Sequence, residues 1–454
     1  MRDLDRIFKA YDIRGTYPDE LDEAVAEAVG GAFVLVTGSA GGTVVVGHDM
    51  RPSSGPLVDA FTSGAVAQGA DVVQIGLVST DALYFASGHL EAAGAMFTAS
   101  HNPAKYNGIK LCRAGAAPVG QDTGLADIRA LVESGVPSAD VPVGAVSQRD
   151  LLDEYSAYLK QLVDVSGIRP LTVVVDAGNG MAGRTAPVVL AGLPLTVVPL
   201  FFELDGTFPN HEANPIEPAN MRDLQAKVVE VGADLGLAFD GDADRCFVVD
   251  EHGGIVTPST LAALIAEREL LREPGATVIH SLITSRVVPE VVLEHGGKPV
   301  RTRVGHSFIK QVMAETGAIF GGEHSGHYYF RDFWRADSGM LAALHTIAAL
   351  GTAPAGATLS SLLAPYHRYE VSGEINSTVN DPAGRMAAVE AQWAGQPEAS
   401  LDHLDGLTVS GPDWWFNLRA SNTEPLLRLN IEAADSATVD RIRNSVLTTV
   451  RENA

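Results

Sequence analysis

Two loops of this sequence carry residues suited to phosphoryl chemistry, and the first is Thr98-Ala99-Ser100-His101-Asn102-Pro103. It combines a hydroxyl and an imidazole with a proline that fixes the exit of the loop. A serine hydroxyl is a weak nucleophile, whereas a phosphoserine is a dianionic phosphoryl donor that a metal ion can neutralise. An ordinary polar turn has the same composition. Ser100 is therefore a candidate phosphoryl carrier that needs support from other parts of the chain.

The second loop, Asp240-Gly241-Asp242-Ala243-Asp244-Arg245, alternates carboxylates directly after an apolar run. This spacing suits a hard cation such as Mg²⁺ or Ca²⁺. A calcium-binding EF-hand is disfavoured, because Arg245 stands where that loop needs glycine and Cys246–Val249 reads as a strand. Two alternatives stay open: a haloacid-dehalogenase type of phosphohydrolase with Asp240 as nucleophile, and a solvated acidic turn.

Two later loops offer groups that bind sugars and phosphates. In Glu323-His324-Ser325-Gly326-His327, acceptors and a titratable donor alternate, which suits sugar hydroxyls, a metal site or a plain polar loop. In Arg419-Ala420-Ser421-Asn422-Thr423-Glu424-Pro425, followed by Arg428, a guanidinium, hydroxyls and an amide gather. Such a set suits phosphate oxygens, and a polar loop closed by proline is the alternative.

Strand and helix patterns indicate how these loops are positioned. Short β-branched runs at Thr43–Val46, Thr172–Val175 and Thr277–Ile279 fit buried strands, and Leu261–Leu271 has the composition of a helix. The alternation of the two patterns predicts the α/β class.

A weak repeat links the loops to this pattern. Glycine-alanine, an apolar strand and a polar loop follow one another in segments that begin at Gly94, Gly232 and Gly317. Three similar α/β domains would each present one loop at the carboxyl end of a strand, where open sheets bind ligands. Chance recurrence of Gly-Ala is the alternative.

The segment after Pro365 differs from the rest. The proline in Ala364-Pro365-Tyr366 predicts a break, after which Tyr369–Asn376 opens a new unit. Gln396–Asp405 is acidic and loop-rich, and Ser436–Arg451 predicts a final helix whose first residue is a good N-cap type. A separate α+β domain is expected here.

Composition limits the class of protein. The chain has 454 residues, 46% of them hydrophobic and 19% charged, which suggests about three domains with sizeable cores. The net charge of −24 disfavours nucleic acid and anionic membranes as partners. Cys112 and Cys246 lack the spacing of a zinc site or a disulfide framework, so a cytoplasmic setting fits best. Met1–Asp12 has no apolar segment typical of an export signal, and no stretch approaches a membrane span.

Taken together, the loops resemble the α-D-phosphohexomutase superfamily, phosphomannomutase/phosphoglucomutase type, in the order of that family. Phe8-Lys9-Ala10-Tyr11-Asp12-Ile13-Arg14-Gly15 is similar to its opening motif, and Thr98–Pro103 to its phosphoserine loop. Asp240–Arg245 resembles its magnesium loop, Gly322–His327 its sugar-specificity loop and Arg419–Thr423 its phosphate-binding loop. Any one match is weak, but the ordered set is specific.

The resemblance implies three similar mixed α/β domains plus a C-terminal α+β domain around a central cleft, with divisions at 1–150, 151–254, 255–366 and 367–454. It also implies a magnesium-dependent isomerase that interconverts hexose 1-phosphates and hexose 6-phosphates, of mannose and/or glucose. Phosphoserine and a hexose 1,6-bisphosphate, which is both intermediate and activator, would carry the phosphoryl group. The expected partners are small hexose phosphates, and the expected assembly is a monomer or homodimer.

The resemblance further assigns residues to roles. The catalytic group comprises Ser100, His101, Lys110, Arg14, Arg245 and His327, with Lys110 and His327 as candidates for general acid or base. The metal ligands are Ser100, Asp240, Asp242 and Asp244. The substrate-binding residues are Tyr11, His306, Glu323, Ser325 and His327. The phosphate-binding residues are Arg419, Ser421, Asn422, Thr423 and Arg428.

One position departs from the family pattern. Some bacterial members have a substrate-contacting lysine near this chain's Ile283, whereas Leu282–Arg286 contains none. The Glu-His-Ser form of the sugar loop favours a phosphomannomutase/phosphoglucomutase, since glucosamine mutases more often have Glu-Gln-Ser. The rival functions are a phosphohydrolase that uses Asp240 covalently and a non-enzymatic sugar-phosphate or calcium-binding protein.

Overall fold

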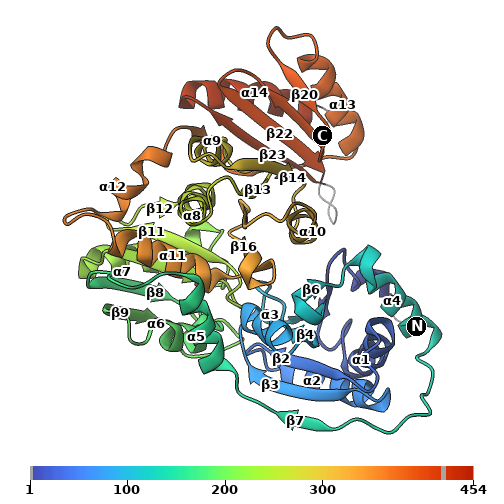
Figure 1. The fold of residues 1–454 in the computed structure, drawn as a ribbon. Helices are drawn as coiled ribbons and strands as arrows, with labels where there is room; N and C mark the ends of the chain where they lie inside the picture. Colours follow the sequence, from blue (N-terminus) through green and yellow to red (C-terminus); the bar gives the residue numbers. More distant parts are fainter. Residues whose placement is uncertain (1–3, 421–425, 453–454) are drawn as a thin grey trace.

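The computed structural model describes residues 4–420 and 426–452, which form four units in chain order. Figure 1 shows the first unit in blue and the second in green at the bottom, the third above them and the fourth in red at the top. Each unit has its own β-sheet. No described helix is both long enough and apolar enough to cross a membrane.

The first unit has a seven-stranded sheet in the order β1-β5-β4-β2-β3-β7, with β6 paired to β5. Its strands are β1 Ile13–Thr16, β2 Thr43–His48, β3 Asp71–Leu77, β4 Ala93–Phe97, β5 Tyr106–Arg113, β6 Ala117–Pro118 and β7 Val146–Gln148. Its helices are η1 Leu4–Arg6, α1 Glu23–Thr37, α2 Ser54–Ala67, α3 Thr80–His89, η2 Ala114–Ala116, η3 Gln121–Thr123 and α4 Leu125–Ser134.

The second unit has a five-stranded sheet in the order β12-β11-β10-β8-β9. Its strands are β8 Leu171–Asp176, β9 Leu195–Leu200, β10 Leu235–Phe239, β11 Cys246–Asp250 and β12 Ile255–Val256. Its helices are α5 Leu152–Leu162, α6 Ala182–Leu190, η4 Pro218–Met221 and α7 Arg222–Val231.

The third unit also has a five-stranded sheet, in the order β14-β13-β15-β16-β17. Its strands are β13 Thr277–Ser281, β14 Lys298–Thr302, β15 Phe320–Gly322, β16 Tyr328–Phe330 and β17 Ala336–Asp337. Its helices are α8 Pro258–Arg272, α9 Val287–Glu294, α10 His306–Thr316, η5 Arg331–Phe333, α11 Gly339–Gly351, α12 Leu359–Leu363 and η6 Ala364–Tyr366.

The first three units share one strand plan. The central strands β2, β8 and β13 each lie between two parallel neighbours, β3 and β4, β9 and β10, and β14 and β15. The last strand of each trio then pairs antiparallel with β5, β11 or β16. The three polar loops all connect that parallel strand to its antiparallel neighbour, so the predicted repeat of domains is confirmed.

The glycine-alanine pairs that suggested the repeat are not equivalent in the structure. Gly232 and Gly317 end helices α7 and α10 in the left-handed conformation, with φ of 62° and 66°. Gly94 instead lies inside β4. The strand-and-loop part of the pattern carried the correct signal, because it alone reflects the shared topology.

The fourth unit is a six-stranded antiparallel sheet in the order β18-β23-β22-β21-β20, with β19 paired to β23. Its strands are β18 Glu370–Val371, β19 Ile375–Thr378, β20 Ser400–Asp402, β21 Leu407–Ser410, β22 Trp414–Ala420 and β23 Leu426–Ala433. Its helices are α13 Pro382–Trp393 and α14 Ser436–Arg451. The predicted α+β unit is confirmed.

Two details of this unit differ from the sequence analysis. The last helix has the predicted bounds, but its N-cap is Asp435, whose carboxylate accepts from the backbone N–H of Thr438, so Ser436 is the first helical residue. The loop-rich segment 396–405 contains the short strand β20, because pairing with β21 overrides its polar composition.

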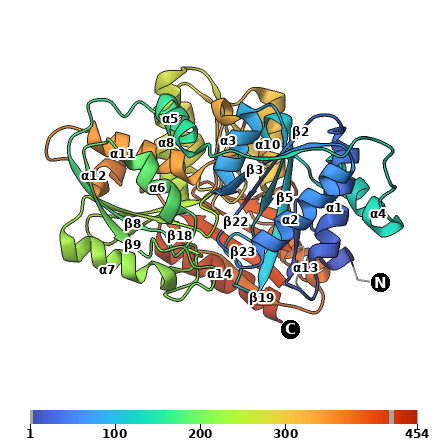
Figure 2. The ribbon, with the colours of Figure 1, turned by 90° about the horizontal axis from the view of Figure 1, so that it is seen from below.

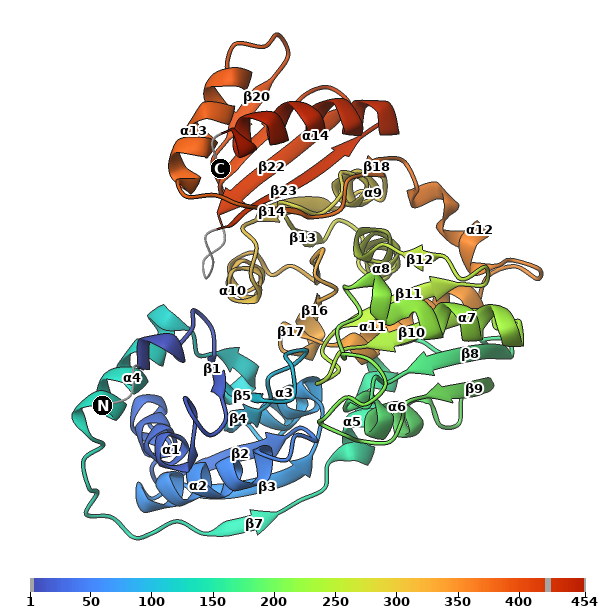
Figure 3. The same ribbon diagram turned by 180° about the vertical axis from the view of Figure 1, so that it is seen from behind.

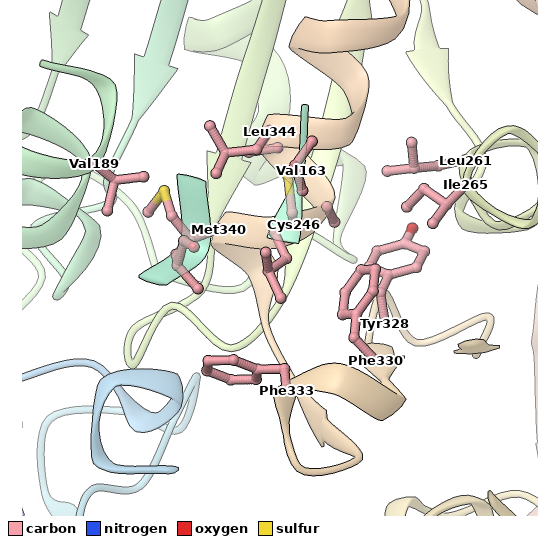
Figure 4. Packing of buried hydrophobic residues seen from close by; sticks show 14 of the residues in the cluster. Val163, Val189, Cys246, Leu261, Ile265, Tyr328, Phe330, Phe333, Met340 and Leu344 are labelled. Carbon is pink, nitrogen blue, oxygen red and sulfur yellow. The ribbon is translucent and has the colours of Figure 1, made fainter. Parts of the chain in front are cut away.

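The buried core separates the fourth unit from the others. One hydrophobic cluster includes Val45, Val173 and Leu341 and so joins the first three units, whereas the fourth has its own cluster around Trp393. Every residue of α11 is buried, which is typical of a helix packed on all sides. Figure 4 shows Met340 and Leu344 of this helix among side chains of both the second and third units.

The chain reaches the fourth unit through α12 and η6 at the predicted break (Figures 2 and 3). The first three units therefore share one hydrophobic cluster, whereas the fourth has its own core, follows a short link and contacts the third unit through Leu282, Ile283 and Trp415.

Candidate active site

The Ser100 loop, Thr98–Pro103, and the aspartate loop, Asp240–Arg245, meet at Ser100 and Asp240, which are 140 residues apart. The Ser100 hydroxyl donates to Asp240 Oδ2 at 2.6 Å, and Ser100 is 5% exposed. Ser100 and Ala243 both have left-handed backbone, with φ of 48° and 59°. Such strain in residues other than glycine is typical of functional loops. A Cβ on Gly241 would lie 2.4 Å from the Ser100 carbonyl oxygen, so this glycine permits the close approach.

Arg245 joins the two loops through its side chain. Its Nε donates to Asp240 Oδ2 at 2.9 Å, and its Nη2 donates to His101 Nδ1 at 2.6 Å and lies 3.5 Å from Ser100 Oγ. Burial, with the charges of Arg245 and Arg14, holds the pKa of His101 well below its usual value. His101 is therefore a neutral imidazole that accepts from Arg245 and keeps the guanidinium beside Ser100.

Lys110 reaches the same loop from β5. Its ammonium donates to Asp242 Oδ2 at 2.7 Å and to Asp244 Oδ2 at 2.6 Å. Burial alone would lower the pKa of Lys110, but these carboxylates outweigh it and hold that pKa well above its usual value. Lys110 is thus a fixed positive charge that can donate a proton or a hydrogen bond, and it is not a base in this arrangement.

The sugar loop of the third unit is held against the aspartate loop. Arg245 and His327 form an isolated antiparallel bridge, which brings His327 Nε2 to 3.6 Å from Asp244 Oδ1. The Ser325 hydroxyl lies 2.8 Å from His327 Nδ1 and 3.4 Å from Glu323 Oε2. Glu323 also accepts from the Tyr329 hydroxyl at 2.7 Å and from the backbone N–H of Gly305 at 3.1 Å.

The opening motif contributes Arg14 and Tyr11. Arg14 Nη1 donates to Asn102 Oδ1 at 2.7 Å, which places the guanidinium against the Ser100 loop. The Tyr11 ring packs edge-on against Phe308 of α10, with 6.3 Å between centroids. Backbone atoms place His306 at the start of α10, while its side chain lies outside what the structure describes.

The predicted phosphate-binding residues lie on the fourth unit. Arg419 ends β22 next to Ala420, and Arg428 stands directly opposite Arg419 on β23. Both guanidiniums contact Glu374. Ser421, Asn422 and Thr423 lie outside the described residues.

A cavity of about 610 Å³ lies between three units. It is lined by Tyr11 of the first unit, Ser307 and Lys310 of the third, and Asp405 and Arg419 of the fourth, among others. The cavity therefore lies between the first, third and fourth units, and its lining includes Tyr11 and Arg419 but not Ser100, Asp240 or Glu323. Its volume is large enough for a phosphorylated sugar.

Comparison with known proteins gives the family. The alpha/beta/alpha domains I, II and III of phosphoglucomutase/phosphomannomutase match residues 5–136, 153–254 and 257–369, and the C-terminal domain of that family matches residues 374–449. The chain belongs to the phosphoglucomutase/phosphomannomutase family. This confirms the superfamily, the α/β architecture of four domains and the isomerase class that the ordered motifs predicted.

Relatives match nearly the whole chain. It is 44% identical over 433 residues to "Phosphohexose mutases" of Xanthomonas campestris pv. campestris, with 95% of each chain covered. It is 39% identical over 450 residues to the phosphomannomutase/phosphoglucomutase of Pseudomonas putida, covering 97% of this chain and 94% of that one. A solved structure of a family protein from Burkholderia thailandensis aligns with a TM-score of 0.90 at 34% identity, covering 100% of this chain and 99% of that one.

The aspartate loop of this family member fits a divalent cation. Oxygens of Asp240, Asp242 and Asp244 lie within 4.8 Å of one another. The Oδ1 atoms of Asp242 and Asp244 are buried and have no hydrogen-bond partner among the described residues. Among the described residues, the lysine and arginine that form ion pairs with these three carboxylates are Lys110 and Arg245. Burial raises the pKa of Asp240 above the usual carboxyl range. Carboxylate oxygens without hydrogen-bond partners are ligands that Mg²⁺ prefers, and the cation would offset the excess negative charge of the three carboxylates.

The structure adds supporting residues that the sequence analysis missed. Arg51 is fully buried, pairs with Asp49 at 3.1 Å and donates to the carbonyl oxygens of Ser100, Asn102, Pro103 and Tyr106. It therefore holds the Ser100 loop in place through hydrogen bonds to the backbone. The only sequence signal was a charged pair, Asp49 and Arg51, at the end of a buried strand.

Thr80 supports the aspartate loop in a similar way from the N-terminus of α3. Its hydroxyl donates to Asp242 Oδ2 at 2.6 Å, and its N–H donates to the Asp242 carbonyl at 3.0 Å. The next residue, Asp81, accepts from the hydroxyls of Tyr155 and Ser338 at 2.7 and 2.6 Å, which ties the first three units together. A single Thr-Asp pair carries no local signal of this role.

Ile283, near which the family resemblance led us to look for a lysine, packs with Leu282 against Trp415 of the fourth unit. The position therefore serves as an apolar contact between the third and fourth units in this chain.

Proposed function

We propose that this protein interconverts hexose 1-phosphates and hexose 6-phosphates, of mannose and/or glucose, through phosphorylated Ser100 and a hexose 1,6-bisphosphate. The observation that carries the proposal is the environment of Ser100 Oγ. It is buried and strained in conformation, 2.6 Å from Asp240 and 3.5 Å from the Arg245 guanidinium. Relatives named as phosphohexose mutases and phosphomannomutases support the same reaction class.

The first transfer breaks the phosphorus–oxygen bond at Ser100 Oγ and forms one to the free 1- or 6-hydroxyl of the sugar. The proton of that hydroxyl leaves to a base, and Ser100 Oγ regains a proton as the phosphoryl group departs. Because such transfer is loose and in line, catalysis depends on positioning and on fixed positive charge. Arg245, Lys110 and Arg14 supply that charge around Ser100. Between the two candidates for general base, the fixed charge of Lys110 favours His327.

The residues that would hold Mg²⁺ are Asp240, Asp242, Asp244 and an oxygen of the phosphorylated Ser100. When bound, the cation would offset the negative charge of the phosphoryl group and make it easier to transfer. Lys110 donates to the Oδ2 atoms of both Asp242 and Asp244, and it thereby keeps the two carboxylates oriented.

Sugar and distal phosphate would bind away from Ser100. Glu323 and Ser325 offer hydrogen bonds to sugar hydroxyls, with Tyr329 and the Gly305 N–H fixing the Glu323 carboxylate. Arg419, Arg428, Ser421, Asn422 and Thr423 would hold the phosphate that is not reacting. After the first transfer the bisphosphate must turn end for end, so that its other phosphate returns to Ser100. The separate core and short link of the fourth unit suit such a movement.

Further parts of the proposal concern organisation. We keep the domain divisions after residues 150, 254 and 366 as part of the proposal, although the second sheet also includes β12 Ile255–Val256, just beyond the second division. The protein would act as a monomer or homodimer on small phosphorylated sugars, and hexose 1,6-bisphosphate would also prime Ser100. Cys112 and Cys246 are both buried free thiols, which supports a reducing, cytoplasmic setting.

Phosphopeptide mapping tests the central claim. After incubation with labelled glucose 1,6-bisphosphate, we expect one labelled peptide, with the phosphate on Ser100. The label should be absent in Ser100→Ala. A phosphohydrolase that used Asp240 would instead keep its label in Ser100→Ala and lose it in Asp240→Asn, and that result would replace this proposal.

A further inference from the structure

The arginine pair of the fourth unit is unusual in its placement. Arg419 on β22 and Arg428 on β23 are direct cross-strand partners in an antiparallel ladder. Like charges in that position repel each other and destabilise the pairing of the strands. Without a bound anion, the pair therefore requires a counter-charge from the protein.

Glu374 supplies that counter-charge. Its Oε2 lies 3.4 Å from Arg419 Nη2, and its Oε1 lies 3.3 Å from Arg428 Nη1, so each oxygen serves one guanidinium. Glu374 occupies the break between β18 and β19, which both pair with β23. The backbone of the sheet thus holds this carboxylate over the arginine pair.

The contacts of Glu374 are loose compared with those of the reaction centre. Both distances lie near the upper limit of a hydrogen bond, and the Glu374 side chain is 28% exposed. The Nε atoms of Arg419 and Arg428 are buried and have no hydrogen-bond partner among residues 4–420 and 426–452. One carboxylate therefore leaves donors unused that a phosphate, with three oxygens, could satisfy.

The site also faces the cleft. Arg419 lines the cavity between the units. The half-buried ring of His324, next to Glu323 in the sugar loop, lies within the electrostatic influence of both Glu374 and Arg419. An anion that replaced Glu374 on the arginines would therefore lie beside the sugar loop.

We propose that Glu374 is an internal substitute for the substrate's distal phosphate, which occupies the arginine pair in the free protein and is displaced when a hexose phosphate binds. This inference rests on the proposed function. Since displacement costs free energy, Glu374 weakens binding of the phosphate. A weaker grip speeds its release, which the bisphosphate requires in order to turn and bind by its other end.

Glu374→Gln tests the inference, because it removes the charge and keeps the shape. We expect it to bind glucose 6-phosphate about fivefold more tightly in equilibrium dialysis. KM should fall by a similar factor while kcat does not rise. The free variant should unfold at a lower temperature than wild type, since the arginines lose their counter-charge, and saturating glucose 6-phosphate should close that gap. Glu370→Gln, an exposed change on neighbouring β18, is the matched control and should alter none of these quantities.

A purely structural role for Glu374 predicts a different outcome. Glu374→Gln would then bind glucose 6-phosphate more weakly and remain less stable with ligand present, and either unchanged or weakened binding overturns the inference. Failure of the proposed function is distinguishable, because wild type itself would then neither bind nor isomerise glucose 6-phosphate, and the inference would fall with it.

Discussion

The reaction centre proposed around Ser100 and the arginine pair of the fourth unit are both proposed to bind phosphate, yet they are built differently. Around Ser100, the hydrogen bonds that other side chains make to Asp240, Asp242 and Asp244 are 2.6 to 2.9 Å long. Arg245 Nη2 lies farther from Ser100 Oγ, at 3.5 Å, and Arg51 and Thr80 support the two loops. Around Arg419, the contacts are 3.3 to 3.4 Å and the partner is partly exposed. We therefore expect the first region to be fixed before the substrate arrives, and the second to exchange Glu374 for a phosphate.

This difference matches the two tasks of a mutase. Phosphoryl transfer requires preorganised charge, because reorganising dipoles during the reaction would raise the barrier. Holding the distal phosphate requires a site that accepts either end of the sugar and lets it go. Changes at the reaction centre should therefore reduce the rate of chemistry, and changes in the fourth unit should mainly alter binding.

Loss of the carrier should have the largest effect. Ser100→Ala should reduce mutase turnover on the order of 10⁴-fold or more, because no other group can accept the phosphoryl. A coupled assay of glucose 1-phosphate conversion measures this, with circular dichroism to confirm the fold. Ser63→Ala, an exposed change on α2, should retain full turnover. Near-normal activity of Ser100→Ala would remove the carrier from the mechanism.

Removal of the cation comes next. Excess chelator should lower turnover by about a thousandfold, since three buried carboxylates would then face the phosphoserine with too little positive charge. Added Mg²⁺ should restore the rate. Full activity in chelator, with no metal detected in the protein by elemental analysis, would contradict the assignment of Asp240, Asp242 and Asp244.

Loss of Arg51, which supports the Ser100 loop, should have a smaller effect on turnover. Arg51→Leu leaves Asp49 buried without its ion-pair partner and frees three carbonyl oxygens of the loop and that of Tyr106 in β5. We expect a loss of about 3–5 kcal/mol in the free energy of unfolding, and turnover about a hundredfold lower as Ser100 moves. Denaturant titration and the coupled assay check both values. Arg6→Leu, which breaks the exposed pair with Glu20, is the control and should change little.

The smallest of these effects should come from the arginine pair. Arg419→Ala or Arg428→Ala should raise KM about thirtyfold, equivalent to about 2 kcal/mol for a lost charge-assisted contact. More hexose 1,6-bisphosphate should escape per turnover, while phosphate on Ser100 should remain. Turnover, released bisphosphate and phosphoserine occupancy are the quantities to measure. Unchanged kinetics in both variants, or loss of the Ser100 phosphate, would show that this region does not hold the distal phosphate.

Much of the fold and of the candidate site could be predicted from the sequence. The runs at Thr43–Val46, Thr172–Val175 and Thr277–Ile279 lie in β2, β8 and β13, and the segment Leu261–Leu271 lies in α8. These elements are readable because hydrophobic spacing is a local property of the chain. The acidic loop and the arginines could also be found from the sequence, because charged residues that directly follow an apolar strand are recognisable in the local composition.

The supporting groups could not be predicted, because their meaning depends on partners far away in the chain. Arg51 and Thr80 are ordinary residue types at the end of a strand and the start of a helix, until folding places them against Ser100 and Asp242. The sequence alone determined which chemical groups are present and the order of the loops that carry them. Only the tertiary structure decided which charges meet, because contacts across 140 residues follow from the packing of whole domains. For the same reason, Glu374 faces Arg419 and Arg428 only because β19 and β22 both pair with β23 in the sheet of the fourth unit.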